Sequence, residues 1–289
     1  MGSNICYPQL KKYKVIDKFS NIGVAFASVG YGNAKGIYTD ERGYFYINDT
    51  IENISVSHLS YFVNNFNLLE KDSILKLNPR VIELQEVVIN SNIKANLTTT
   101  FFGTYYKKEK FKFFCFPKTE FITYMKPSKK VENFTVTQIY IPCSLDCIDK
   151  KRKKIKEIEK FVFRIKVYDS DRERLFSGIL IVAKKEIEEN EVIYNLEKGL
   201  LFPFEGLYIG VELIGWYNNE NEFVDNSYSN KQDNCIRLKF SRTKEYNTYF
   251  INPFSPDNDW KEIKKYNKNF DLTLKKPLGL AIGLGLKEN

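Results

Sequence analysis

The chain has 289 residues, of which 43% are hydrophobic and 28% charged, and its formal net charge at pH 7 is +8. This balance is typical of a folded globular protein and excludes a disordered chain. The only histidine is His58, which excludes a zinc site built on two or three imidazoles. No apolar run reaches the roughly 18 residues of a membrane helix. The first residues lack the basic and apolar segments of an export signal, so the amino-acid sequence alone favours a cytoplasmic protein.

Residues 13–89 predict a succession of short strands separated by polar turns, as is typical of a β-sandwich. Asp40 to Gly43 forms the turn of a predicted hairpin, in which Asp40 caps the turn and Gly43 takes a positive φ. The predicted strands are Tyr13–Ile16, Val24–Val29, Ile37–Thr39, Tyr44–Ile47, Ile54–His58, Ile74–Leu77 and Val81–Ile89.

The order of these motifs resembles the carboxypeptidase regulatory-like domain, a transthyretin-like (Ig-like) β-sandwich. The matching stretches are Asn21–Val29, Gly36–Phe45, Ile54–Tyr61 and Leu84–Ile89, and the second of them follows the pattern G-x-x-T-D-x-x-G-x-F. The sequence departs from the family at Ser60, where glycine is common. The resemblance covers about residues 12–90 and implies a non-catalytic module of the Gram-negative cell envelope, often found with TonB-dependent receptors.

The second part of the chain also predicts strands. In Phe161–Tyr168, apolar residues alternate with Arg164 and Lys166, which places the two cations on the opposite face of the strand. The stretches Phe163–Asp169 and Phe202–Glu212 resemble uncharacterised domains that follow a regulatory-like module. The other predicted strands are Thr135–Ile141, Ser177–Val182, Leu207–Ile214, Cys235–Phe240 and Leu278–Leu286.

A change in charge marks the boundary between the two parts. Residues 1–92 hold equal numbers of basic and acidic residues, so the whole excess of +8 lies beyond them, and the polar stretch Asn90–Asn96 predicts a linker. We therefore expect an all-β chain in three pieces. A tail spans residues 1–11, the transthyretin-like sandwich residues 12–92, and a larger jelly-roll-like sandwich residues 97–289.

Paired acids give one candidate metal site and no catalytic centre. Asp257 and Asp259 form a D-x-D pair whose oxygens suit a structural Ca²⁺ or simply stabilise a turn, and Asp169-Ser-Asp171 is a second such pair. Glu205 and Glu212 form a nominal glycosidase pair, but any chain with this many acids offers one. We expect no cofactor beyond this calcium.

The remaining reactive side chains favour structural roles. We expect His58 to fill a face of the sandwich with a hydrogen-bonded ring, and the adjacent Ser57 points to the opposite face, which excludes a catalytic triad. Cys143 and Cys147 are either buried or loop thiols or a disulfide. Lys150–Lys156 is either a solvated loop or a contact with an anionic surface, and no nucleic-acid motif accompanies it.

The sequence thus predicts a non-catalytic binding or scaffolding protein, an accessory subunit that docks onto an outer-membrane receptor or assembly complex. We expect no transmembrane segment of its own and an export signal that has been removed, which makes the periplasm or outer membrane the expected location instead of the cytoplasm. Trp216, Tyr217 and Trp260 are the candidate binding residues, and the alternative for these aromatic rings is packing at the edge of the core. One alternative is a carbohydrate-binding module that uses an exposed Trp216 or Trp260. Another is an enzyme with an unfamiliar site, which needs clustered ionisable groups.

Overall fold

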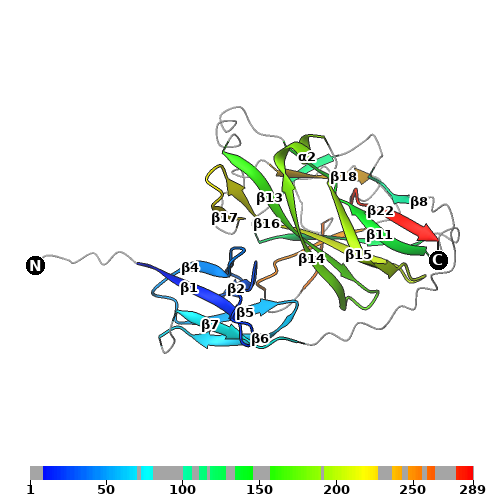
Figure 1. Cartoon of the computed structure of the whole chain (residues 1–289). Helices are drawn as coiled ribbons and strands as arrows, with labels where there is room; N and C mark the ends of the chain where they lie inside the picture. Colours follow the sequence, from blue (N-terminus) through cyan, green and yellow to red (C-terminus); the bar gives the residue numbers. More distant parts are fainter. Residues whose placement is uncertain are drawn as a thin grey trace, which may run out of the picture. The chain divides into compact units, whose positions relative to one another are not determined.

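The computed structural model is an all-β protein with several sheets (Figure 1). It describes residues 9–69, 73–80, 100–105, 111–115, 118–127, 134–145, 157–189, 192–226, 236–242, 247–255, 259–263 and 278–288. In this part of the chain, no helix is long and apolar enough to cross a membrane.

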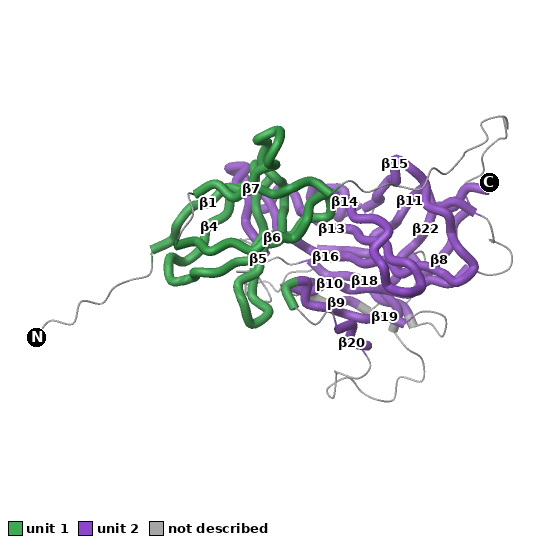
Figure 2. The backbone as a smooth tube through the Cα atoms, turned by 90° about the horizontal axis from the view of Figure 1, so that it is seen from below, with its two compact units in different colours: residues 1–88, 254–256 green, residues 89–253, 257–289 purple. Residues whose placement is uncertain are grey.

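The chain divides into two compact units, which are drawn in different colours in Figure 2. Unit 1 comprises Met1–Val88 and the short segment Phe254–Pro256. Unit 2 comprises Ile89–Pro253 and Asp257–Asn289. The expected linker Asn90–Asn96 and the expected strand Val81–Ile89 lie outside the described residues.

Unit 1 contains two sheets. In the first, β1 (Leu10–Asp17) lies between β4 (Tyr44–Asn48), to which it is antiparallel, and β7 (Ile74–Leu77), to which it is parallel. The second sheet is antiparallel. Its strands, in spatial order, are β3 (Gly36–Tyr38), β2 (Ser28–Gly30), β5 (Asn53–His58) and β6 (Tyr61–Asn67).

The core of unit 1 lies between these two sheets. Alternate residues of the first sheet, such as Val15 and Leu75, belong to the same buried cluster as Val29 and Val56 of the second. A strand exposes every second side chain to one face, so this pattern brings the two apolar faces together. The arrangement is consistent with a β-sandwich, and the other face of the first sheet carries polar and exposed residues apart from the buried Ile16.

The predicted hairpin across Asp40–Gly43 is wrong, although its turn forms as expected. Asp40 Oδ1 accepts the N–H groups of Arg42 and Tyr44 at 2.8 Å, and Gly43 has a φ of 82°. However, β3 pairs with β2 and β4 pairs with β1, in different sheets. The Gly43 carbonyl accepts the Val15 N–H at 2.8 Å, which directs the chain after the turn into the sheet of β1.

The predicted strand Val24–Val29 is shorter in the structure. Phe26 has a φ of 53°, outside the β region, and only Ser28–Gly30 forms a strand. The buried Thr39 hydroxyl accepts the Ala27 N–H and donates to the Val24 carbonyl, both at 2.8 Å. This backbone therefore pairs with a side chain as well as with neighbouring backbone, because the Val24 N–H donates to the Val15 carbonyl and the Ala27 carbonyl accepts the Thr39 N–H.

The largest sheet of unit 2 has seven antiparallel strands. They lie in the order β14 (Arg174–Ala183), β13 (Ile158–Tyr168), β16 (Leu207–Asn218), β10 (Glu120–Met125), β19 (Thr248–Ile251) and β20 (Lys261–Glu262), with β17 (Phe223–Asp225) also beside β16. A short helix, α2 (Lys184–Glu188), follows β14 and was not predicted.

Two four-stranded sheets complete unit 2. One has the order β15 (Ile193–Leu201), β11 (Phe134–Tyr140), β22 (Gly283–Glu288) and β8 (Thr100–Gly103). The other places β18 (Ile236–Arg242) between β12 (Cys143–Leu145) and β21 (Leu278–Leu280), and also pairs it with β9 (Phe111–Phe114). The expected single strand Leu278–Leu286 is wrong, because β21 and β22 belong to different sheets.

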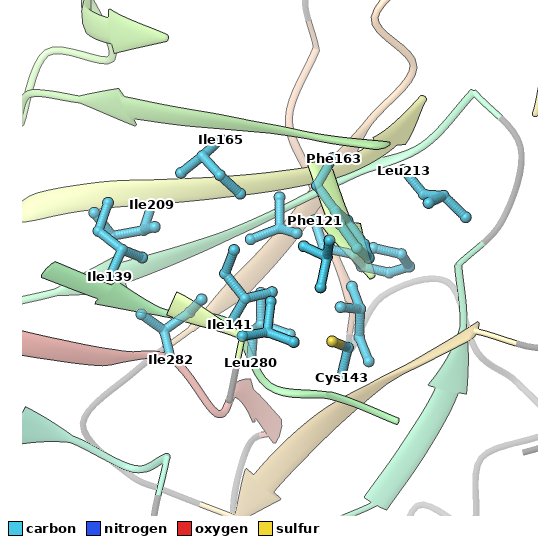
Figure 3. Close-up of a cluster of buried hydrophobic side chains, with 14 of the residues drawn as sticks. Phe121, Ile139, Ile141, Cys143, Phe163, Ile165, Ile209, Leu213, Leu280 and Ile282 are labelled. Carbon is cyan, nitrogen blue, oxygen red and sulfur yellow. The ribbon is translucent and has the colours of Figure 1, made fainter. Parts of the chain in front are cut away.

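The core of unit 2 gathers apolar side chains from all three sheets. Figure 3 shows Phe163 and Ile209 of the large sheet together with Ile139 of β11 and Cys143 of β12. Phe163, Ile165 and Val167 of β13 face this core, as predicted. The opposite face of β13 is also buried at its centre, and this is where the charged side chains lie.

Candidate functional site

An exposed loop follows β1 in unit 1 and presents two large apolar side chains to solvent. Phe19 is 75% exposed and Ile22 is 68% exposed. Asp17 Oδ1 accepts the N–H groups of Phe19 at 2.8 Å and Ser20 at 2.7 Å, and Asn21 has a φ of 58°. The loop is therefore tightly bound by local hydrogen bonds, and its apolar side chains are presented on a fixed backbone.

Asp17 also connects this loop to the second sheet of unit 1. The backbone N–H of Ser20 lowers the pKa of the Asp17 carboxyl, and the hydroxyl of Tyr61 at the start of β6 adds a further hydrogen bond that lowers it. Burial raises the pKa of Tyr61, and Asp17 raises it further. Asp17 therefore accepts hydrogen bonds as a carboxylate, and Tyr61 donates as a phenol.

Phe62 and Val63 follow Tyr61 and are also exposed. The Phe62 N–H donates to the Asn78 carbonyl at 3.0 Å, and the Lys18 N–H donates to the adjacent Leu77 carbonyl at 3.0 Å. The loop and the start of β6 therefore lie at the same end of the sandwich. We call Phe19, Ile22 and Phe62 the apolar tip, and Val63, the next residue of β6, points to the opposite face of the strand.

A second group of side chains forms a buried ionic network in unit 2. Glu120 and Glu212 are each 1% exposed, and Arg164 and Lys166 are also buried. Lys166 Nζ contacts Glu120 Oε2 and lies 3.4 Å from Glu212 Oε2, which lies 3.7 Å from Arg164 Nη1. The Tyr168 hydroxyl donates to Glu120 Oε1 at 2.8 Å. Two carboxylates and two cations thus balance in formal charge.

The strand register explains how the network assembles. Arg164, Glu212 and Glu120 occupy directly opposed positions on β13, β16 and β10. Lys166 lies opposite Gly210, which has no side chain. The Glu120 carboxylate fills the space above Gly210, where a Cβ would overlap it. The absence of a side chain at Gly210 lets the carboxylate approach Lys166.

Burial raises the pKa of Tyr168, and the negative charge of Glu120 raises it further. The hydroxyl therefore keeps its proton and acts as a donor. Buried charges are costly unless they are paired and hydrogen-bonded. This arrangement suits a network that fixes three strands against one another.

An aromatic cluster adjoins the network through Tyr168. The ring centroid of Trp260 lies 5.1 Å from Tyr168, 5.0 Å from Tyr208 and 6.0 Å from Tyr249. The Arg172 guanidinium lies 4.9 Å from the Trp260 ring. These contacts hold Trp260 at 8% exposure.

Of the two alternatives for the candidate binding aromatics, the structure supports packing against the core and not exposure for binding. Trp216 is 7% exposed, Tyr217 is also buried, and Trp216 belongs to the main core of unit 2. The reason is that β16 continues beyond the predicted end at Ile214 to Asn218 and pairs with β17. Trp216 and Trp260 lie in different clusters, so the structure does not bring them together.

The acidic candidates are only partly described. Asp259 is exposed, and Asp257 lies outside the described residues. Asp169 Oδ1 accepts the N–H groups of Asp171 and Glu173, so this pair forms the β13–β14 turn. In the described part of the chain, no three His, Cys, Asp or Glu side chains are grouped to hold a metal ion. The calcium site stays a prediction.

The histidine and the cysteines have structural surroundings. His58 Nδ1 accepts the Ser60 N–H at 3.2 Å, so its ring is hydrogen-bonded as expected. Cys115 and Cys143 are free and buried, and burial raises the pKa of Cys143 to about 12. Cys143 therefore forms no disulfide with Cys147, which lies outside the described residues, as does Lys150–Lys156.

The sequence analysis missed both the apolar tip and the ionic network. A usable signal existed for the network, because Glu212 interrupts the apolar stretch Leu207–Ile214 and Arg164 and Lys166 alternate with core residues.

No protein-family model, no curated protein and no solved structure matches this chain.

Proposed function

We propose that this protein is a non-catalytic binding or scaffolding protein of the Gram-negative cell envelope, and that unit 1 docks it onto an outer-membrane protein complex. The apolar tip is the observation that carries this proposal. Among the described residues, eight exposed large hydrophobic side chains belong to unit 1 and four to the larger unit 2. Grouped exposed apolar side chains mark interaction sites.

The fold assignments are part of the proposal. Unit 1 is a transthyretin-like sandwich of the carboxypeptidase regulatory-like type, and unit 2 is a jelly-roll-like sandwich. The resemblance over residues 12–90 supports the first assignment, and the turn at Asp40 and Gly43 has the backbone that its motif requires. The periplasm or outer membrane is the compartment that this resemblance implies.

The tip suits a protein partner. Phe19 and Ile22 bury large apolar areas on contact, and the loop that carries them is already ordered by Asp17. Side chains on a pre-ordered backbone lose little conformational entropy on binding. Aromatic side chains at the centre of an interface commonly dominate its affinity.

The two alternative functions have less support. Sugar binding through Trp216 or Trp260 requires a free ring face, and both rings are buried. An enzyme requires ionisable groups that reach a substrate, whereas the ionic network pairs Lys166 with Glu120 and Glu212 at buried positions.

The test is purification of the tagged, full-length protein from its native envelope in mild detergent, followed by mass spectrometry. We expect one outer-membrane protein in stoichiometric amount. The variant Phe19→Ser/Ile22→Ser should lose this protein while it keeps its folded circular dichroism spectrum.

The matched control is Leu175→Ser/Ile181→Ser, which removes two exposed apolar side chains from β14 in unit 2. It should retain the partner. A chain that purifies alone, or a partner that both double variants retain, contradicts docking through the apolar tip.

A further inference from the structure

The outward face of the three-stranded sheet in unit 1 carries cations and aromatic rings in register. Lys12 lies directly opposite Tyr46, and Lys14 lies opposite both Tyr44 and Ile74. Their neighbours in sequence, such as Tyr13 and Phe45, face the core. We call Lys12, Lys14, Tyr44, Tyr46, Ile74 and Lys76 the lysine–tyrosine face.

The ammonium groups on this face are held close together. Lys12 Nζ lies 4.1 Å from the ring centroid of Tyr44, and Lys14 Nζ lies 4.9 Å from the same centroid. A cation over an aromatic ring is attracted by the ring's quadrupole. Tyr44 therefore places two positive charges side by side on an ordered sheet.

Among the described residues, this face carries no acid that would neutralise these charges. The outward positions of β1, β4 and β7 hold three lysines and no aspartate or glutamate. The structure shows no salt bridge to Lys12 or Lys14 from any residue that it describes. Charge complementarity therefore calls for an anionic ligand.

Exposed apolar side chains border the cations. Ile74 is 50% exposed beside Lys14, and Leu10, at the start of β1, is also exposed. A hydrophilic polyanion leaves such side chains in water. At the surface of a bilayer, by contrast, lipid phosphates bind lysine ammonium groups, and aliphatic side chains are buried at the boundary with the acyl chains.

Tyr44 argues against a nucleic acid or a glycan as the ligand. Bases and sugars bind aromatic residues by stacking on a free ring face. The ammonium groups of Lys12 and Lys14 lie over the ring of Tyr44. The Tyr44 ring serves here to position cations, and tyrosine is also a favoured residue at the level of lipid headgroups.

We propose that the lysine–tyrosine face binds the surface of an anionic phospholipid bilayer, so that unit 1 lies on a membrane as a peripheral protein. This goes beyond docking onto a protein partner and does not depend on it. Each lysine near an anionic surface contributes about fivefold in partitioning.

The test is co-sedimentation of the full-length chain with vesicles. We expect binding to vesicles of phosphatidylcholine mixed with phosphatidylglycerol, and none to phosphatidylcholine alone. Binding should be lost in about 1 M salt, where the Debye length falls to about 3 Å. Lys12→Glu/Lys14→Glu should bind at least about 25-fold more weakly.

Lys11→Glu/Lys18→Glu is the matched control, because it changes the net charge equally at exposed positions outside the face. It should retain more than half of the binding. Equal loss in both double variants indicates attraction by net charge alone and overturns the proposal. Binding to heparin through Lys12 and Lys14 without binding to vesicles also overturns it.

Two further variants keep the test decisive. If Lys12→Glu/Lys14→Glu does not fold, Lys12→Gln/Lys14→Gln removes the same positive charges without adding negative ones. This variant should still lose binding to the vesicles. Phe19→Ser/Ile22→Ser should keep vesicle binding, which separates this face from the apolar tip.

Discussion

Glu120 and Glu212 lie directly opposite each other on the neighbouring strands β10 and β16, and both carboxylates are buried. Like charges at opposed positions of a sheet destabilise it. Lys166 offsets this repulsion, because its Nζ contacts Glu120 and lies 3.4 Å from Glu212. Lys166 is the cation that contacts both carboxylates, so the stability of the seven-stranded sheet depends on it more than on Arg164, which lies near Glu212 alone.

Lys166→Met should destabilise the protein strongly. The substitution keeps most of the volume of the side chain but leaves two buried carboxylates with too little positive charge. Removal of one partner from a buried ion pair costs about 3–5 kcal/mol in the free energy of unfolding. Urea denaturation followed by circular dichroism measures this loss.

Lys160→Met is the matched control for Lys166→Met. Lys160 lies on the same strand, β13, but is exposed. Its substitution should change the free energy of unfolding by no more than about 0.5 kcal/mol. Similar costs at the two positions would show that Lys166 does not act through the buried carboxylates.

Gly210→Ala should destabilise the protein by about 1–3 kcal/mol, because the added methyl group overlaps the Glu120 carboxylate. The cost should fall in the background of Glu120→Ala, where the space is free. A double-mutant cycle in urea denaturation measures this coupling, which we expect at about 0.5–3 kcal/mol. Additive effects would mean that the two residues do not compete for this space.

Much of unit 1 could be predicted because apolar and polar residues alternate in some of its strands. Ile54 and Val56 are buried while Ser55 and Ser57 are half-buried, and this period of two predicts β5 from the sequence alone. The pairing of the strands was not predictable in this way. Asp40 and Gly43 specify a reversal of the chain, but a hairpin and a crossover between sheets use the same local turn.

The functional candidates were harder to predict for a physical reason. Polar residues lie near Trp216 and Trp260 in the sequence and leave both exposure and packing open, whereas burial depends on which strands they pair with and cover. The ionic network joins Glu120, Lys166 and Glu212 across three strands. Only the register of those strands brings them together.

Thr39→Val should cost about 1–3 kcal/mol although the two side chains have nearly the same shape. The Thr39 hydroxyl is buried, accepts the Ala27 N–H and donates to the Val24 carbonyl. Valine leaves both backbone groups buried without this partner. Thermal or urea denaturation measures the loss. Thr50→Val, at an exposed position, should be nearly neutral, and an equal loss there would contradict this role of Thr39.

The buried thiols should make the folded protein less stable in alkali. Burial raises the pKa of Cys143 from its usual 9 to about 12 and also raises the pKa of Cys115. Well below pH 9 both thiols are neutral in the folded and unfolded chains, so their ionisation does not change the free energy of unfolding. As the pH rises from 9 towards about 12, the unfolded chain ionises first, and the free energy of unfolding falls.

The same burial predicts that Cys143 and Cys115 resist alkylation in the folded protein, because the thiolate is the reactive species. Iodoacetamide at pH 9, followed by mass spectrometry of the peptides, should label both residues in urea and neither in buffer. Cys143→Val should reduce the loss of stability in alkali, since it removes one ionising group. Labelling of Cys143 at equal rates in buffer and in urea would contradict its burial between β12 and the core of unit 2.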